Sequence, residues 1–390
     1  MSGQILVGTR KGTFIVEKGA SGWQARAAGH IGTGVNYVAK DPYTGRLWAL
    51  LGHGHWGAKV SISDDGGATW SDNPAQIRYP EGARFIAQDM YEDASSEMGI
   101  GWKISTKPAT LQKLWVLGFA PGKVYVGTIP GGLFESSDGG ATFSLNMDLW
   151  NHESRGGDLS SGDTKAETKW FGTPASEGGD FAPGIHSIVV DPRDGNRVLI
   201  AVSTAGVIET TDGGKTWRSR NKGMANDHSP DPEAEWGHDT HNIDLCTNQP
   251  DHVWQQNHAG VFYSADGAAT WTKVSVPESA VHFGFPVTAD ADDGRVAWLV
   301  PLQGDNQRTA VGGGLFVART DDGGVTWKQF RNGLPQECAW DVTYRHALAN
   351  DGGCVAFGTT TGNLYVSEDR GESWITVGNN FPPIYSVRFG

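Results

Sequence analysis

Short apolar stretches alternate along this chain with turns rich in Gly, Asp, Ser and Thr. The stretches have the length of β-strands, and some, such as residues 384–388, alternate apolar and polar positions as a half-buried strand does. Six of the turns follow the pattern S-x-D-x-G-x-T-W, with conservative replacements at the hydroxyl and aromatic positions. The six copies begin at Ser63, Ser136, Thr210, Ser264, Thr320 and Ser367. A repeat of this kind predicts an all-β protein built from similar units.

The residue types of this pattern explain why it forms a turn. The Asp carboxylate accepts hydrogen bonds from backbone N–H groups nearby, and Gly takes the positive φ that a tight hairpin needs. The hydroxyl groups add local bonds of the same kind. The aromatic residue begins the next strand and can pack between neighbouring sheets. We therefore interpret all six copies as structural, including the one in which Ala268 replaces Gly.

The pattern resembles the Asp-box, or BNR repeat, of sialidases, sortilin-type receptors, xyloglucan hydrolases and photosystem II assembly factors. The resemblance covers nearly the whole chain and implies a β-propeller, with the boxes on outer hairpins away from any active site. Within this group the chain is most similar to bacterial BNR-repeat proteins labelled glycosidase-like. Three segments carry that likeness: residues 183–186, 344–346 and 382–385.

A seventh unit lacks its box. Residues 7–14 parallel residues 126–134 and 357–365, and this unit ends at Trp23. It starts at its second strand, whereas residues 384–388 form an inner strand that no further sheet follows. We therefore predict a seven-bladed β-propeller, a single domain over residues 1–390, whose ring is closed by pairing of the N- and C-terminal strands.

The composition restricts the classes of partner that the protein can bind. The formal net charge is −13 and no Lys/Arg cluster is visible, which disfavours nucleic acid and anionic membrane surfaces. Three cysteines are too few for a disulfide framework. The N-terminus has no basic and apolar leader, and no apolar run approaches membrane-spanning length. We therefore expect a cytoplasmic protein whose partner is a small molecule.

Four segments make the chain longer than seven minimal blades. They are residues 71–110, 144–183, 218–239 and 303–313. Each lies in a connection that emerges opposite the Asp-box turns in an up-and-down blade. We therefore expect all four insertions on the top face, where they would wall a pocket over the central channel.

Histidines from separate blades are predicted to converge on that pocket. His186 and His241 open inner strands at the same register, and Asn36 holds the corresponding place in an earlier unit. Imidazole is the usual metal ligand and titrates near neutral pH, so the cluster could hold Zn, Mn, Fe or Cu or transfer protons. Alternatively, each His bonds a loop backbone and packs the funnel. The predicted metal ligands are His53, His55, His186, His241, His258 and His282.

Acidic and other polar residues accompany the histidines. Asp239 lies beside His241, Arg155 lies in the second insertion, and Asp341 opens the last complete blade. The candidate catalytic residues are His186, His241, Asp239, Asp341, Arg155 and Tyr385. The Arg-Ile-Pro segment and the arginine triad that sialidases use are not visible, so we do not expect sialidase activity.

Three functions remain open at this point. The first is a hydrolase or lyase that acts on a small, sugar-derived or anionic molecule in the histidine funnel with the help of a metal. The second is a metal-independent glycoside hydrolase that uses two carboxylates. The third is a propeller without catalytic activity that binds a protein partner. The fold alone does not decide between them.

Overall fold

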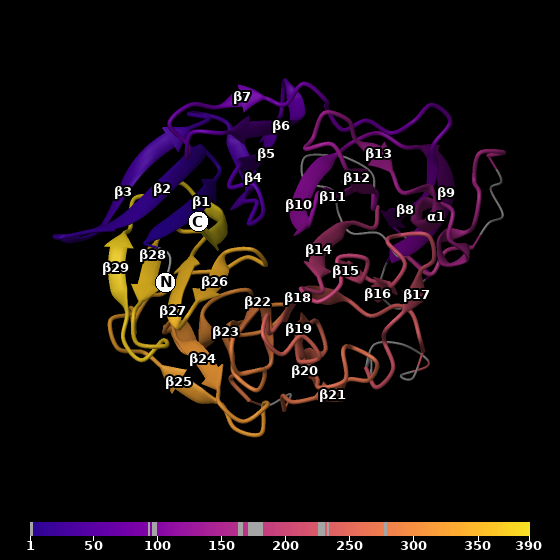
Figure 1. Cartoon of the computed structure of the whole chain (residues 1–390). Coiled ribbons are helices and arrows are strands. Elements are labelled where there is room, and N and C mark those ends of the chain that lie inside the picture. Colours follow the sequence, from indigo (N-terminus) through magenta and orange to yellow (C-terminus); the bar gives the residue numbers. More distant parts are fainter. Residues whose placement is uncertain are drawn as a thin grey trace.

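The computed structural model describes residues 3–92, 94–95, 100–162, 167–170, 182–224, 231, 234–276 and 279–390. Seven four-stranded antiparallel sheets stand around a central axis (Figure 1). The predicted seven-bladed β-propeller is therefore confirmed. Parts of the predicted insertions 71–110, 144–183 and 218–239 lie outside the described residues.

Each sheet begins at the central axis and runs outward. In chain order the first three are β1 Gln4–Thr9, β2 Gly12–Gly19 and β3 Gly22–Gly29 with β30 Ile384–Phe389; β4 Gly34–Lys40, β5 Leu47–His53, β6 Gly57–Ser63 and β7 Ser71–Asp72; and β10 Lys113–Ala120, β11 Lys123–Ile129, β12 Leu133–Ser136 and β13 Ser144–Leu145. Two short helical segments follow, α1 Met147–Trp150 and the 3-10 helix Glu153–Arg155.

The remaining four sheets complete the ring. They are β14 Ile185–Val190, β15 Val198–Val202, β16 Gly206–Thr210 and β17 Arg218–Ser219; β18 Thr240–Leu245, β19 Val253–Asn257, β20 Gly260–Ser264 and β21 Thr272–Lys273; β22 Phe283–Ala289, β23 Ala297–Leu302, β24 Val317–Thr320 and β25 Lys328–Phe330; and β26 Leu348–Asp351, β27 Cys354–Gly358, β28 Leu364–Ser367 and β29 Ile375–Gly378. A second 3-10 helix, Val311–Gly313, lies between β23 and β24.

The two ends of the chain close the ring, as predicted. Strand β30 pairs antiparallel with β1, for example Leu6 opposite Arg388 and Val7 opposite Val387. The last strand thus supplies the inner strand that the first sheet lacks (Figure 1). Pairing of the two ends removes a free strand edge, which would otherwise be open to association with another chain.

One hydrogen-bond arrangement repeats in the six predicted turns. In the first, the hydroxyl of Ser63 donates to Asp65 and accepts the N–H of Gly67, while Asp65 accepts both the N–H and the hydroxyl of Thr69. Ala268 still donates its N–H to Ser264 and adopts φ 65°, so the copy without Gly keeps the same turn. The carboxylate and hydroxyl therefore satisfy the backbone of each turn.

In several of these turns, the aromatic residue at the end of the motif hydrogen-bonds to the preceding sheet. The indole N–H of Trp70 donates to the carbonyl of Ala28 in β3, and that of Trp271 donates to the carbonyl of Arg220 next to β17. Between sheets, apolar residues such as Leu6 and Ala49 pack together without solvent exposure. Burial of a large apolar side chain contributes about 1.5–3 kcal/mol, so the cores between adjacent sheets hold the ring together.

A β-bulge recurs in the inner strands. In five sheets a single residue of the inner strand is skipped in the pairing, and in a sixth the irregularity spans Phe285 and Pro286. A bulge leaves the extra residue unpaired and redirects its side chain. The five skipped residues are Asn36, Trp115, His186, His241 and Tyr385. The inner strands therefore present a distinct set of side chains around the channel.

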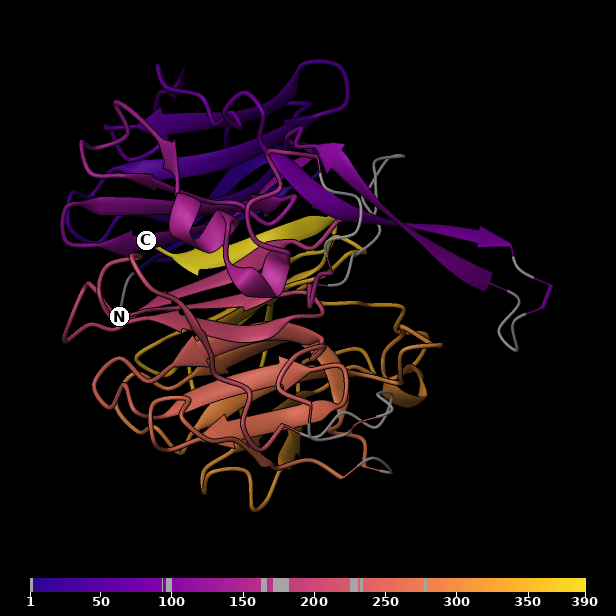
Figure 2. The ribbon, with the colours of Figure 1, turned by 90° about the vertical axis from the view of Figure 1, so that its right-hand side faces the viewer.

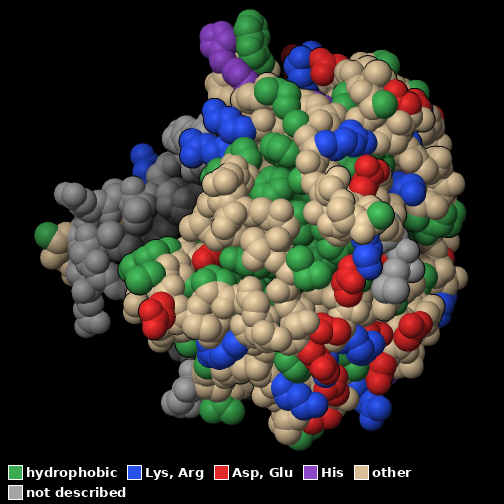
Figure 3. All heavy atoms as spheres, turned by 90° about the vertical axis from the view of Figure 1, so that its left-hand side faces the viewer, with side chains coloured by type: hydrophobic (Ala, Val, Ile, Leu, Met, Phe, Trp, Pro, Cys, Tyr) green, Lys and Arg blue, Asp and Glu red, His purple; other side chains and the backbone are tan. Residues whose placement is uncertain are grey.

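Outside the ring, β8 Arg84–Glu92 and β9 Ile100–Pro108 form a separate two-stranded sheet. Figure 2 shows this hairpin projecting far from one face of the ring. On the face in Figure 3, acidic and basic side chains are interspersed in small groups. The three cysteines are free, with Cys246 and Cys354 buried. Among the described residues, no helix has the length and apolar composition needed to cross a membrane.

Candidate functional site

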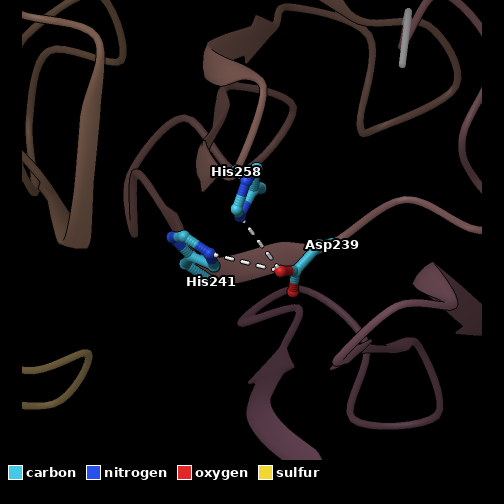
Figure 4. A group of neighbouring side chains, drawn as sticks. All are labelled: Asp239, His241 and His258. Carbon is cyan, nitrogen blue, oxygen red and sulfur yellow. Dashed lines mark ion pairs between the residues drawn. The ribbon is translucent and has the colours of Figure 1, made fainter. Parts of the chain in front are cut away.

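Three of the predicted site residues meet at one end of a single sheet. Asp239 precedes β18, His241 lies in β18, and His258 follows β19. Their potential ligand atoms all lie within 4.8 Å of one another, and Figure 4 shows the carboxylate of Asp239 facing both imidazole rings. We call these three residues the Asp–His–His cluster.

The local strand geometry explains why these side chains meet. Asp239 and His241 are two positions apart, so in extended backbone they lie on the same side. Thr240, between them, pairs with Asn257, and the N–H of His258 donates to the carbonyl of Asp239 at 2.9 Å. The bulge at His241 adjusts its direction relative to the sheet. The cluster thus forms from two adjacent strand ends.

The distances in the cluster leave space for a shared ligand. The Oδ2 atom of Asp239 lies 3.5 Å from Nε2 of His241 and 3.4 Å from Nδ1 of His258. The Nδ1 atom of His241 lies 2.6 Å from the carbonyl oxygen of Gly284. Because that oxygen can only accept, Nδ1 carries the proton and Nε2 presents its lone pair toward Asp239. The other carboxylate oxygen, Oδ1, is buried and has no hydrogen-bond partner among the described residues.

A second layer of residues surrounds the cluster. The Oδ2 atom of Asp305 lies 3.8 Å from Nε2 of His258, and Arg308 pairs with Asp305 at 2.5 Å. The rings of Phe283 and Phe285 lie 5.4 Å and 4.9 Å from that of His241. These aromatic rings limit water on one side of His241, and the Asp305 carboxylate faces the far nitrogen of His258.

The electrostatics hold Asp239 as a carboxylate and move the pKa values of the two histidines in opposite directions. Burial tends to raise the pKa of Asp239, but the two neighbouring imidazoles outweigh it and hold that pKa well below its usual range. Burial lowers the pKa of His241. The hydrogen bond to Asp239 raises the pKa of His258. A carboxylate and neutral imidazoles are the ligand forms that transition metals bind.

A large cavity lies over the central channel next to the cluster. Its volume is about 730 Å³, and its lining includes the bulged residues Asn36, Trp115 and Tyr385. The cluster does not itself line this cavity. Arg345 connects the two, because it lines the cavity and its positive charge lowers the pKa of Asp239. We call this space the central cavity.

Residues 344–346 form the floor of the central cavity. The carbonyl of Arg345 accepts from Asn242 at 2.9 Å, and Nε2 of His346 donates to the carbonyl of His186 at 2.6 Å. These bonds reach from the segment before β26 to β18 and β14, across the channel. His346 lines both the central cavity and a second cavity of about 310 Å³ below it. His346 therefore borders both cavities.

The structure does not bring all six predicted histidines together, and the expected convergence is corrected here. Nδ1 of His53 accepts from the N–H groups of His55 and Trp56, while the ring of His55 lies 4.7 Å from that of Trp56 at the surface. His282 lies 3.3 Å from the hydroxyl of Ser275. His53 and His55 lie at the β5–β6 turn and His282 lies just before β22, so they belong to other sheets than the Asp–His–His cluster. His53 does line the central cavity.

His186 and Tyr385 lie at the channel without joining the cluster. His186 is fully buried, its ring lies 5.3 Å from that of Trp115, and it lines the lower cavity. Burial holds its pKa well below the ordinary value, so its imidazole is neutral. Tyr385 lines the central cavity, and its ring lies 6.1 Å from that of Tyr344. Both residues therefore border the channel.

Arg155 and Asp341 have contacts that explain them structurally. The guanidinium of Arg155 lies 4.1 Å from the ring of Trp150 and 4.4 Å from that of Trp170, and it donates to the carbonyl of Gly131. Asp341 is buried and accepts from the side chains of Thr361 and Asn363 at 2.6 Å. Neither residue contacts the Asp–His–His cluster in the part of the chain that the structure describes. Packing and turn formation account for their positions.

Sequence reasoning missed two residues of the site. Asp305 lies in the predicted insertion 303–313, but nothing in that segment indicated that it would face His258. Arg345 was visible in the sequence, yet the direction of its side chain depends on residues 344–346 crossing the channel. The repeated inner-strand bulge was the available signal, since Asn36, His186 and His241 share one register.

Comparisons with known proteins define the fold. No protein-family model and no curated protein matches this sequence. An ancestral GH74 enzyme is 14% identical, with a TM-score of 0.53, over 89% of this chain and 39% of that chain. A putative 6-phosphogluconolactonase from Bacteroides fragilis is 12% identical, with a TM-score of 0.53, over 99% and 97%. One from Bacteroides uniformis is 12% identical, with a TM-score of 0.52, over 99% of each chain.

These similarities place the fold among the β-propellers. At identities of this size they extend to the fold and not to a reaction. The chain spans about two fifths of the GH74 enzyme, which is much longer. Its function therefore has to be argued from the side chains of its own site.

Proposed function

We propose that this protein is a hydrolase or lyase that acts on a small molecule with the help of a divalent transition metal held by Asp239, His241 and His258. One observation carries the proposal: one carboxylate and two imidazoles place ligand atoms within 4.8 Å of one another. Two imidazoles and a carboxylate suit Zn, Mn, Fe or Cu.

The surrounding residues fit such a centre. Histidines that bind metals almost always donate their other ring N–H to a carbonyl or carboxylate. Gly284 fills that role for His241, and Asp305 faces the far nitrogen of His258. The unpartnered, buried Oδ1 of Asp239 is a further acceptor without an assigned bond among the described residues. A bound metal would supply Lewis acidity and lower the pKa of a coordinated water.

The chain's own residues would do the remaining work. The carboxylate of Asp239 would balance part of the charge of a metal ion held between the two imidazoles. The carbonyl of Gly284 holds His241 in the tautomer whose Nε2 is free to bind. Phe283 and Phe285 exclude water from one side of that ring. The substrate would bind in the central cavity, with Arg345 between it and the cluster.

The two alternatives have less support. A glycoside hydrolase with two carboxylates needs one that is protonated at neutral pH. Asp239 has its pKa held low, and Asp341 is engaged by Thr361 and Asn363. A binding protein without catalytic activity needs no converging Asp–His–His cluster. Trp56 and Trp340 are exposed on the described surface and could contact a protein partner. The measurement of activity therefore also distinguishes an enzyme from a binding protein.

We also infer that the chain is an Asp-box, or BNR-repeat, propeller. The support is the one hydrogen-bond arrangement found in all six turns. Two structural neighbours are described as a GH74 enzyme and a putative lactonase, which agrees with a hydrolase without indicating a substrate. We further propose that the protein is cytoplasmic. The net charge of −13 supports the proposal that it does not bind nucleic acid or anionic membranes.

Elemental analysis tests the metal directly. Protein purified without a polyhistidine tag should contain about one equivalent of a transition metal per chain, which follows from one cluster. His258→Asn should lose it, while His252→Asn, a change to a histidine that contacts Tyr263 on the outer part of the same sheet, should retain it. Hydrolysis of a panel of lactones, esters and glycosides should fall when a chelator removes the metal. Metal-free wild-type protein with unchanged activity would contradict the proposal.

A further inference from the structure

The central cavity has a charge opposite to that of the protein as a whole. The chain carries 44 acidic and 31 basic residues, apart from His. The cavity of about 730 Å³ is nevertheless lined by Arg10, Lys113 and Arg345, and no Asp or Glu lines it within the described ranges. Low-dielectric walls concentrate the field of such groups. A positive cavity in an acidic protein favours an anionic ligand.

Arg345 is the cation at the floor of this cavity. Its guanidinium carbon lies 5.6 Å from the ring centre of Trp115 and 5.0 Å from that of Phe285. These rings come from sheets that are not adjacent, so the side chain extends across the mouth of the channel. In the part of the chain that the structure describes, its Nε atom is buried without a hydrogen-bond partner. Arg345 is half-buried, and the Asp239 carboxylate acts on its charge without a hydrogen bond that satisfies Nε. A guanidinium with such a buried, unsatisfied donor is stabilised when a ligand accepts a hydrogen bond from it.

The other polar groups of the cavity are suited to the same ligand. Tyr344, Tyr385 and Asn36 also line it. The amide of Asn36 already donates to the carbonyl of Leu114, which fixes its orientation. A guanidinium binds a carboxylate or phosphate through two parallel N–H donors. The arrangement therefore offers one strong anion site with a polar surround.

We propose that the central cavity binds a small organic oxyanion, through a carboxylate or a phosphate group that Arg345 holds. This inference rests on the proposed function in one respect: the bound molecule would be the substrate presented to the Asp–His–His cluster. Lys113 and Arg10 attract the anion, and Arg345 fixes it. Anion binding itself does not need the metal.

The experiment uses full-length protein freed of metal with a chelator, so that its outcome is independent of the metal proposal. Titration calorimetry with malonate, with inorganic phosphate and with the neutral analogue malonamide compares the two oxyanion classes. Wild-type protein should bind at least one of the anions and not malonamide. Arg345→Gln should weaken that binding about ten- to hundredfold, the loss of one charge-assisted pair. Arg26→Gln, on the exposed strand β3, is the matched control and should bind as the wild type does.

A second variant keeps the proposal testable if Arg345→Gln fails to fold. Lys113→Gln changes a residue at the edge of the cavity, beside the ring of Trp115, and should weaken anion binding several-fold. Preference for malonate identifies a carboxylate ligand, and preference for phosphate identifies a phosphorylated one. Absence of binding by both anions, or equal binding by wild type, Arg345→Gln and Lys113→Gln, would overturn the proposal. If the wild-type protein binds an anion but takes up no metal in the separate metal analysis, only the proposal of a metal centre is refuted.

Discussion

Nδ1 of His241 donates its proton to the carbonyl oxygen of Gly284 over 2.6 Å, so the opposite nitrogen, Nε2, faces the carboxylate of Asp239. Gly284 belongs to the neighbouring sheet, in β22. The position of one sheet relative to the next thus fixes the tautomer of a residue in the cluster. Two groups that only accept, the Nε2 lone pair and the carboxylate, lie 3.5 Å apart, which is unfavourable unless a cation or a proton lies between them.

Asp305 should raise the metal affinity of the Asp–His–His cluster through its contact with His258. Its carboxylate faces Nε2 of His258 at 3.8 Å, and outer partners of this kind usually contribute 10- to 100-fold to metal affinity. Asp305→Asn is expected to weaken Zn²⁺ binding about tenfold, measured by competition with a chromophoric chelator. Asp293→Asn, in an exposed turn, should leave the affinity unchanged. Equal affinities for wild type and Asp305→Asn would show that Asp305 does not act on His258.

Glu209 should be a stabilising residue of the ring. Its fully buried carboxylate accepts from Arg197, Arg218 and Arg220 at 2.7–2.8 Å. Removal of one partner from a buried charged cluster costs about 3–5 kcal/mol. Glu209→Gln should therefore lower the free energy of unfolding by about 3 kcal/mol in urea denaturation. The exposed Glu17→Gln is the control, and a similar loss in both variants would contradict this interpretation.

The turn motif should contribute to stability through its hydroxyl. Ser367 is buried, donates to Asp369 and accepts the N–H of Gly371 at 2.8 Å. Ser367→Ala leaves those groups without their partner, which costs about 1–3 kcal/mol. Thermal unfolding should show a lower Tm for Ser367→Ala and an unchanged Tm for Ser21→Ala, in an exposed turn. An unchanged Tm in both would mean that water replaces the hydroxyl without cost.

His30 should make the free energy of unfolding depend on pH. Burial lowers its pKa from 6.5 to about 4, although Asp72 opposes this, and its ring nitrogens contact Thr13 and Ser61. The folded state then binds fewer protons than the unfolded state between pH 6.5 and 4. The stabilisation is therefore complete above pH 6.5 and is lost as the pH falls toward 4. The difference in free energy of unfolding between wild type and His30→Asn should shrink over that range, and a constant difference would contradict the assignment.

Much of the fold could be predicted from local patterns. The six turn motifs fix a repeat because each carboxylate and hydroxyl satisfies its own turn, so no distant residue is needed. The unpaired inner strand at residues 384–388 predicted ring closure for a similar reason. These features depend on residues close in sequence or on the number of strands in a sheet.

The site was less accessible to sequence reasoning. Asp239 and His241 could be paired because they are two positions apart in a strand, but the partner role of His258 depends on strand register. His53, His55 and His282 were assigned to the same centre because loop directions cannot be read from a sequence. The position of Arg345 follows from hydrogen bonds between residues 344–346 and two other sheets. Side-chain direction at bulges and crossings was therefore the missing information.

Titration of chelator-treated protein with Zn²⁺ tests the central claim most directly. Calorimetry on the tag-free wild type should give about one site per chain, because one cluster offers three protein ligands. Asp239→Asn and His258→Asn should each weaken binding at least about a hundredfold, more than the change of an outer partner. Wild-type protein that takes up no Zn²⁺, Mn²⁺, Fe²⁺ or Cu²⁺, or variants that bind as tightly as the wild type, would contradict a metal centre at Asp239, His241 and His258.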